Sequence, residues 1–177
     1  VPVFVITPEG APDGPDAPIF FNVHGGAFYI GGGDACRAMG RQMTADVQLR
    51  TWCVDYRMPP DHPYPAALDD CLAAYRHLLE VCEPERIVVG GGSAGGNLAA
   101  ALVLRARDEG LPLPRALVLL TPEADLTESG DSFATNLGID PILRSKLSES
   151  IALYAGDHDL TDPYLSPLFG DFSPPFP

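Results

Sequence analysis

Short apolar runs alternate with segments of helical periodicity along most of the chain. The helical period is clearest within residues 66–82, where Leu68, Leu72, Tyr75 and Leu79 recur every three or four positions and give a helix one apolar face. Strands that alternate with helices are typical of an α/β protein with a mostly parallel, doubly wound sheet. The pattern predicts strands at Val3–Ile6, Ile19–Val23, Thr51–Tyr56, Arg86–Gly90 and Ala116–Leu120, and helices at Ala35–Leu49, Ala66–Val81 and Ala94–Asp108.

The pattern loosens after Thr121. Residues Pro141–Gly156 are expected to form a further helix with Leu147, Ile151 and Tyr154 on one face, followed by a proline-rich tail.

A glycine cluster with Ser93 at its centre separates a predicted strand from the predicted helix that begins at Ala94. Gly91 and Gly95 lie two positions on either side of the serine and have no side chain to obstruct a sharp turn. This is the G-x-S-x-G pattern, in which a strained strand-to-helix turn holds a nucleophilic serine at the edge of a sheet. A purely structural glycine turn is the alternative interpretation.

The same glycines fit a second motif. Gly90, Gly92 and Gly95 also match G-x-G-x-x-G, the pattern of dinucleotide-binding loops. That motif needs an acidic residue about 20 positions further on to hold a ribose, and Glu123 and Asp125 lie too far along the chain. No Lys-Ser or Lys-Thr pair follows the cluster, which excludes a P-loop.

A second glycine turn favours acyl transfer. The apolar run Ile19–Val23 ends in His24-Gly25-Gly26. Two glycines after a strand leave backbone N–H groups free to point at a ligand, as an oxyanion hole requires. A further donor is expected from the residue after the nucleophile, here Ala94.

Four segments carry a resemblance to a known family. They are His24–Gly26, Asp55–Asp70, Gly91–Asn97 and Asp162–Leu168, and they resemble motifs of the hormone-sensitive-lipase-type family of α/β-hydrolase esterases. The resemblance runs from about Ile19 to the end of the chain. It implies an α/β-hydrolase fold and the hydrolysis of carboxylic esters.

The resemblance also implies roles for individual residues. Ser93 matches the nucleophile, and Gly25, Gly26 and Ala94 match the oxyanion donors. His24 is expected to order its glycine loop. The chain departs from the family at Gly92, where the family usually has an acidic residue, and at Ala27, a common variant of a fourth motif glycine.

The catalytic acid and histidine of the family follow the Asp162–Leu168 segment and the next strands, so both are expected beyond Pro177. Of the four histidines only His158 follows Ser93, and it closes a helix-like segment rather than a strand, which makes it a poor base.

By the same resemblance, residues 1–121 are expected to form part of the hydrolase core. Residues 122–177 are expected to form a cap-region segment and the start of the C-terminal core. The N-terminal cap is expected to lie outside this chain.

The composition of the chain limits which kinds of partner it can bind. A formal net charge of −13 argues against nucleic acid and against anionic membrane surfaces, and no apolar run approaches the roughly 20 residues of a membrane span. The four cysteines form no C-x-x-C pair and no local cluster with histidine, so we predict no metal, free thiols and a cytoplasmic protein. No cofactor is expected, and homo-oligomerisation is left open.

The sequence therefore predicts a serine carboxylesterase that acts through an acyl-enzyme, with short-chain esters as substrates by resemblance. The alternative is a hydrolase-like binding protein that keeps the pocket as a small-molecule receptor without a complete triad.

Overall fold

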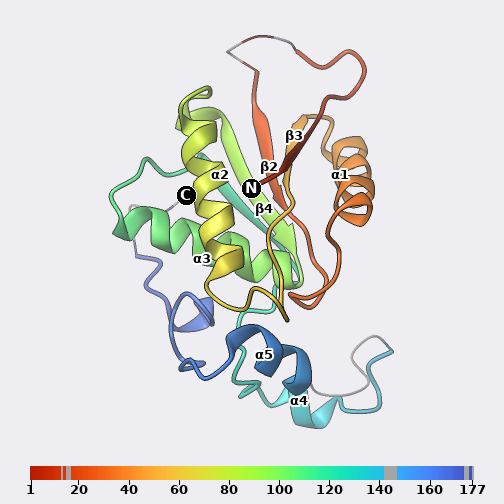
Figure 1. Ribbon diagram of the computed structural model, residues 1–177, viewed down its shortest axis with the longest axis vertical. Helices are drawn as coiled ribbons and strands as arrows, with labels where there is room; N and C mark the ends of the chain where they lie inside the picture. The colour runs from red at the N-terminus through yellow and green to blue at the C-terminus, as the bar shows by residue number, and fades with distance from the viewer. Residues whose placement is uncertain (13, 15–16, 142–146, 174–175, 177) are drawn as a thin grey trace.

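Five strands form one sheet at the centre of the fold: β1 (Val3–Ile6), β2 (Ile19–Val23), β3 (Arg50–Val54), β4 (Ile87–Gly92) and β5 (Ala116–Leu120). The computed structural model describes residues 1–177 except 13, 15–16, 142–146, 174–175 and 177. The strand order is β1-β3-β2-β4-β5 (Figure 1). β1 runs antiparallel to β3, and all other neighbours are parallel. The predicted mostly parallel α/β sheet is confirmed.

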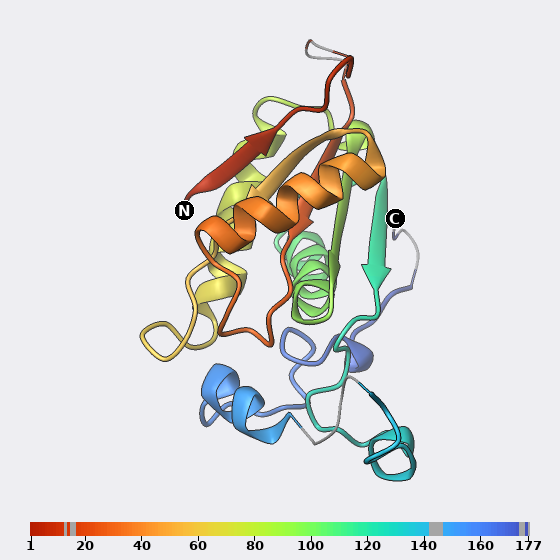
Figure 2. The same cartoon turned by 90° about the vertical axis from the view of Figure 1, so that its right-hand side faces the viewer.

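Three long helices cover the two faces of the sheet: α1 (Asp34–Val47), α2 (Ala66–Leu79) and α3 (Ala94–Asp108). Helix α1 lies on one face, while α2 and α3 lie on the other (Figures 1 and 2). Neighbouring side chains of a strand point to opposite faces of the sheet, and β3 contacts both helical layers in this way. Cys53 packs against Gly40 of α1, whereas the ring of Trp52 lies 6.0 Å from the ring of His77 on α2. Both faces are covered, which explains why β2 is buried along its whole length.

Strands β3 and β4, which follow β2 along the chain, lie on opposite sides of β2 in the sheet. The chain passes from β2 through α1 to β3 on one side, and from β3 through α2 to β4 on the other side. Ligands of such sheets bind beyond the carboxyl ends of the strands where the chain changes side. The fold therefore directs attention to the ends of β2 and β4, where the two glycine turns lie.

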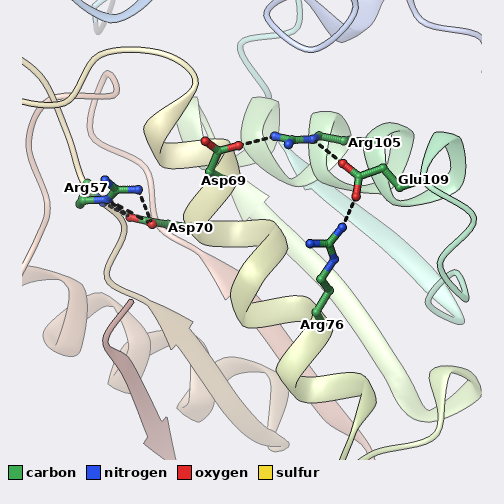
Figure 3. Close-up of polar contacts among 6 residues, drawn as sticks. All are labelled: Arg57, Asp69, Asp70, Arg76, Arg105 and Glu109. Atoms are coloured by element: carbon green, nitrogen blue, oxygen red, sulfur yellow. Dashed lines mark hydrogen bonds and ion pairs between the residues drawn. The ribbon is translucent and has the colours of Figure 1, made fainter.

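Ion pairs hold α2 against α3 (Figure 3). Arg105 of α3 binds Asp69 of α2 at 2.6 Å and Glu109 at 2.9 Å, and Glu109 also pairs with Arg76 of α2. These side chains are partly exposed, so each pair stabilises the fold only modestly, and the apolar core beneath them contributes more.

A second pair fixes the turn that leads into α2. The Arg57 guanidinium donates to the Asp70 carboxylate in three side-chain hydrogen bonds of 2.9, 3.0 and 3.2 Å (Figure 3). The backbone N–H of Arg57 donates to the same carboxylate at 2.9 Å. Fork-to-fork contacts of this kind fix orientation as well as distance. They hold the segment after β3 beside the start of α2.

The chain after β5 lies below the carboxyl edge of the sheet (Figure 2). It contains α4 (Ser132–Thr135), which the sequence pattern did not predict, and α5 (Ser148–Ala155). The helix predicted over 141–156 is confirmed only for its second part, and residues 142–146 lie outside the described residues. Short 3-10 turns form at η1 (Pro84–Arg86) and η2 (Pro167–Phe169).

Strand β5 forms one edge of the sheet, and Val118, Leu119 and Leu120 are more than a third exposed there. An apolar edge strand presents unpaired N–H and C=O groups that pair readily with another strand. The described part of the chain thus leaves room for further strands beside β5.

Candidate active site

Ser93 occupies the turn between β4 and α3. Its backbone has φ 54° and ψ −125°, a conformation that costs a non-glycine residue on the order of 1–3 kcal/mol. Surrounding bonds hold it there: Ser93 N–H donates to the Leu120 carbonyl at 3.0 Å, and the Ser93 carbonyl accepts from Asn97 and Glu123, both at 3.1 Å. The residue is exposed although its neighbours Gly91 and Ala94 are buried. The strand-to-helix turn predicted from the glycine pattern is present.

The glycines around Ser93 are required to different degrees. A Cβ on Gly91 would lie 2.4 Å from the Gly95 carbonyl oxygen, and one on Gly95 would lie 2.2 Å from that of Val23. A Cβ on Gly92 would meet nothing closer than 3.4 Å. Steric exclusion therefore explains Gly91 and Gly95, whereas a Cβ at position 92 has room.

The glycine loop after β2 lies directly against the serine turn. A Cβ on Gly25 would be 2.8 Å from the Gly92 carbonyl oxygen and 3.5 Å from Ser93 Cβ. Gly26 has φ +130° and leaves a Cβ only 2.0 Å from the Ile30 carbonyl oxygen, so a side chain is excluded at this position too. The structure thus brings Gly25, Gly26, Ser93 and Ala94 together at the ends of β2 and β4.

Backbone donors are available in this group. Among the described residues, the N–H groups of Gly25, Gly26 and Ala94 donate to no protein acceptor. Unpaired N–H groups next to a serine, with the N-terminus of a long helix behind them, suit the developing negative charge of a tetrahedral intermediate.

His24 is packed behind the loop and is only 2% exposed. Its ring stacks on Tyr56 with centroids 4.1 Å apart, and the Tyr56 hydroxyl donates to the His24 carbonyl oxygen at 2.8 Å. Burial lowers the pKa of His24, since it disfavours the imidazolium. Tyr56 was not among the site residues predicted from the sequence. Tyr56 lies two residues after β3, whose carboxyl end lies beside that of parallel β2, so its place in the site depends on this strand pairing.

His158 makes its described contacts with other residues. It is exposed, its Nδ1 is 2.9 Å from the Ala155 carbonyl oxygen, and its ring meets Tyr64 edge-on at 4.9 Å. No described hydrogen bond or ring contact joins it to Ser93. The expectation that His158 is a poor general base is in keeping with these contacts.

Two carboxylates of the acidic segment after β5 are buried. Asp125 and Glu128 are 8% and 9% exposed. Asp125 accepts from the backbone and side chains of Thr127 and Ser129, and Glu128 accepts from Leu147 N–H at 2.7 Å. These carboxylates organise the chain that covers the carboxyl edge of the sheet.

Glu123, in the same segment, is the exception because its buried Oε1 has no hydrogen-bond partner. Burial, together with the charges of Glu128 and Asp125, raises the pKa of Glu123 to about 7. Its backbone N–H donates to the Ser93 carbonyl oxygen at 3.1 Å, so the backbone of residue 123 lies beside the serine turn.

We expect Glu123 to make the fold less stable as the pH rises. The ordinary pKa of 4.5 is raised to about 7 in the folded state, so the stabilisation is complete below pH 4.5 and is lost as the pH rises through 7. Urea unfolding at pH 5 and pH 8 should show a loss on the order of 1 kcal/mol, discounted for partial exposure, that Glu123→Gln removes. The exposed Glu149→Gln serves as control, and equal pH dependence in both variants would contradict the expectation.

All four cysteines are free and buried. Burial raises the pKa of Cys36 to about 12 and that of Cys53 to about 11, so neither thiol is a ready nucleophile at neutral pH. The prediction of free thiols is confirmed in the structure.

The sheet order and the paired turns define an α/β protein whose site lies at the carboxyl edge. A family model described as alpha/beta hydrolase fold matches residues 20–176, and the chain belongs to that family.

Individual relatives agree with this assignment. The chain is 37% identical to an esterase of Acinetobacter venetianus over 161 residues, which covers 86% of this chain and 52% of the relative. It is similar to the crystal structure of an esterase from the bacterial hormone-sensitive lipase family, with a TM-score of 0.90, 37% identity, and coverage of 99% of this chain and 58% of the other. It is also similar to EstE5 in crystals soaked with p-nitrophenyl butyrate, with a TM-score of 0.90, 33% identity, and coverage of 99% of this chain and 58% of the other.

The predicted resemblance to the hormone-sensitive-lipase-type esterases is confirmed. The chain spans about half the length of the esterase relative, 52%. No helix in the described part of the chain is long and apolar enough to cross a membrane.

Proposed function

We propose that the protein is a carboxylic ester hydrolase that uses Ser93 as its nucleophile. The observation that carries the proposal is the contact between the two glycine turns, because it sets unpaired backbone N–H groups beside an exposed serine in a strained turn. The esterase names of the relatives support the same reaction.

In the proposed reaction Ser93 Oγ attacks the acyl carbon of the ester. The N–H groups of Gly25, Gly26 and Ala94 donate to the oxyanion that forms, and the N-terminus of α3 adds a favourable field. A histidine supplied by the rest of the protein takes the serine proton and passes it to the leaving alcohol, and water then hydrolyses the acyl-enzyme. His24 is proposed to act indirectly, by holding the glycine loop through its stacking on Tyr56. The family assignment and the free N–H groups favour this reaction over the dinucleotide-binding alternative.

The organisation of the chain follows from the same proposal. Residues 1–121 form the core that carries both turns, and residues 122–177 contribute a cap-region segment and the start of the C-terminal core. The buried free thiols support a reducing compartment, in keeping with a cytoplasmic enzyme.

Turnover of p-nitrophenyl esters by the full-length protein tests the reaction and the acyl-chain preference together. Acetate and butyrate esters should be hydrolysed with kcat/KM at least about tenfold above that for palmitate. One methylene group that does not fit a substrate pocket lowers kcat/KM by about tenfold or more. The butyrate ester is the natural first choice, because EstE5 crystals were soaked with it. A protein that binds these esters without turnover would favour the receptor alternative.

A further inference from the structure

A group of three potential metal ligands lies behind the glycine loop. His24 follows the end of β2, Cys36 lies in the first turn of α1, and Asp55 follows the end of β3. One ligand atom from each residue lies within 4.8 Å of the others. The residues are far apart in sequence, which is why no local spacing revealed the group.

The imidazole of His24 has a free ligand atom. Its Nδ1 lies 2.8 Å from the Gly25 carbonyl oxygen, and a carbonyl can only accept, so Nδ1 carries the hydrogen. In the neutral ring Nε2 then has an unshared electron pair, and this buried atom has no hydrogen-bond partner. Metal-binding histidines characteristically donate their second ring N–H to a backbone carbonyl in this way, because the bond fixes both tautomer and orientation.

The other two residues also have ligand atoms that could bind a metal ion. The fully buried Cys36 thiol makes only a long contact of 3.5 Å to the Val54 carbonyl oxygen. Asp55 accepts a hydrogen bond from Gly33 N–H at 2.9 Å. This bond orients the Asp55 carboxylate, which would supply negative charge to a metal ion. A buried nitrogen lone pair with no donor in reach costs free energy unless something binds it.

We propose that His24, Cys36 and Asp55 form a binding site for a divalent transition-metal ion of the zinc type. Nitrogen, thiolate and carboxylate ligands together suit Zn²⁺, whose bonds of about 2.0–2.3 Å place tetrahedral ligand atoms about 3.3–3.8 Å apart. The ligand atoms, all within 4.8 Å of one another, must therefore approach by at most about 1–1.5 Å when the ion binds. As the metal–sulfur bond forms, the Cys36 proton leaves to solvent.

Metal binding would connect β2, α1 and β3 immediately behind Gly25 and Gly26. The ion would thus stabilise the conformation of the glycine loop without contacting the ester. Any ligand bound only by the folded state raises the melting temperature, so zinc should stabilise the protein against heat. This inference does not depend on the proposed esterase reaction.

Equilibrium dialysis of the full-length protein against ZnCl2, followed by elemental analysis, tests the site. We expect one zinc ion per chain for the wild type, and an affinity lower by roughly tenfold or more for Cys36→Ser and for Asp55→Asn. The matched control is Cys53→Ser, which removes another buried thiol that is not in the group and should bind zinc as the wild type does.

Cobalt substitution provides a second readout that does not depend on activity. Co²⁺ bound by the wild type should give an intense near-ultraviolet thiolate-to-cobalt band that is absent in Cys36→Ser, while Asp55→Asn keeps the band at higher cobalt concentration. The isosteric Asp55→Asn retains the oxygen that accepts from Gly33, so the test holds even if Cys36→Ser fails to fold. Wild-type zinc binding no greater than that of Asp55→Asn, or no thiolate band, would overturn the proposal.

Discussion

Ser93→Ala in the full-length protein should lower kcat for p-nitrophenyl butyrate by on the order of 10⁶. The variant removes the only atom that is proposed to attack the acyl carbon, and leaves the oxyanion donors in place. Residual hydrolysis should remain above the rate in water, because positioning and the oxyanion hole still act. The fold should be retained, since Ser93 is exposed and the turn is held through its backbone.

The matched control is Ser132→Ala, at the exposed start of α4. It removes a hydroxyl of the same kind from the segment that covers the carboxyl edge, and its kcat should equal that of the wild type. If Ser93→Ala kept more than about a tenth of the wild-type kcat, the nucleophile would have to be another residue.

Gly95→Ala should impair folding and activity severely, although alanine normally favours a helix. In an exposed helix the change would stabilise by about 1 kcal/mol. Here the added Cβ would lie 2.2 Å from the Val23 and 2.5 Å from the His24 carbonyl oxygen, so α3 must move away from the end of β2. We expect a loss of about 2 kcal/mol or more in the free energy of unfolding, and kcat lower by at least about 10² because the two turns separate.

Gly92→Ala is the paired control within the same motif. Its Cβ has a nearest neighbour at 3.4 Å, so the variant should unfold within about 0.5 kcal/mol of the wild type and keep its activity. Urea unfolding and butyrate hydrolysis of the two variants measure the difference. Equal behaviour of Gly95→Ala and Gly92→Ala would show that close packing of the turns is not what requires glycine.

The sheet was predictable because its signals are local. The strands Val3–Ile6, Ile19–Val23 and Ala116–Leu120 match the observed bounds, and the other two shift by one or two residues at their ends. Except for β3, each is a short apolar run bounded by loops or a glycine cluster, and at β2 burial between two helical layers favours such a run. The segment after β5 was harder, because α4 is a four-residue helix without an apolar period.

The site was predictable only where the chain carries a motif. Both glycine turns could be found because sharp turns restrict residue type. Tyr56 and the partnership of His24 with Cys36 and Asp55 depend on which strands become neighbours, and no spacing along the chain encodes that. The burial of Asp125 and Glu128 was missed for a related reason, since composition alone does not distinguish a solvated carboxylate from one that caps a buried turn.

The most direct measurement is the position of a covalent adduct. The full-length protein is treated with a fluorophosphonate, digested, and analysed by tandem mass spectrometry alongside Ser93→Ala and Ser132→Ala. We expect one adduct per chain on Ser93, formed in step with the loss of butyrate hydrolysis, unchanged in Ser132→Ala and absent in Ser93→Ala. An adduct on any other residue whose formation parallels the loss of activity would contradict the assignment of Ser93 as the nucleophile.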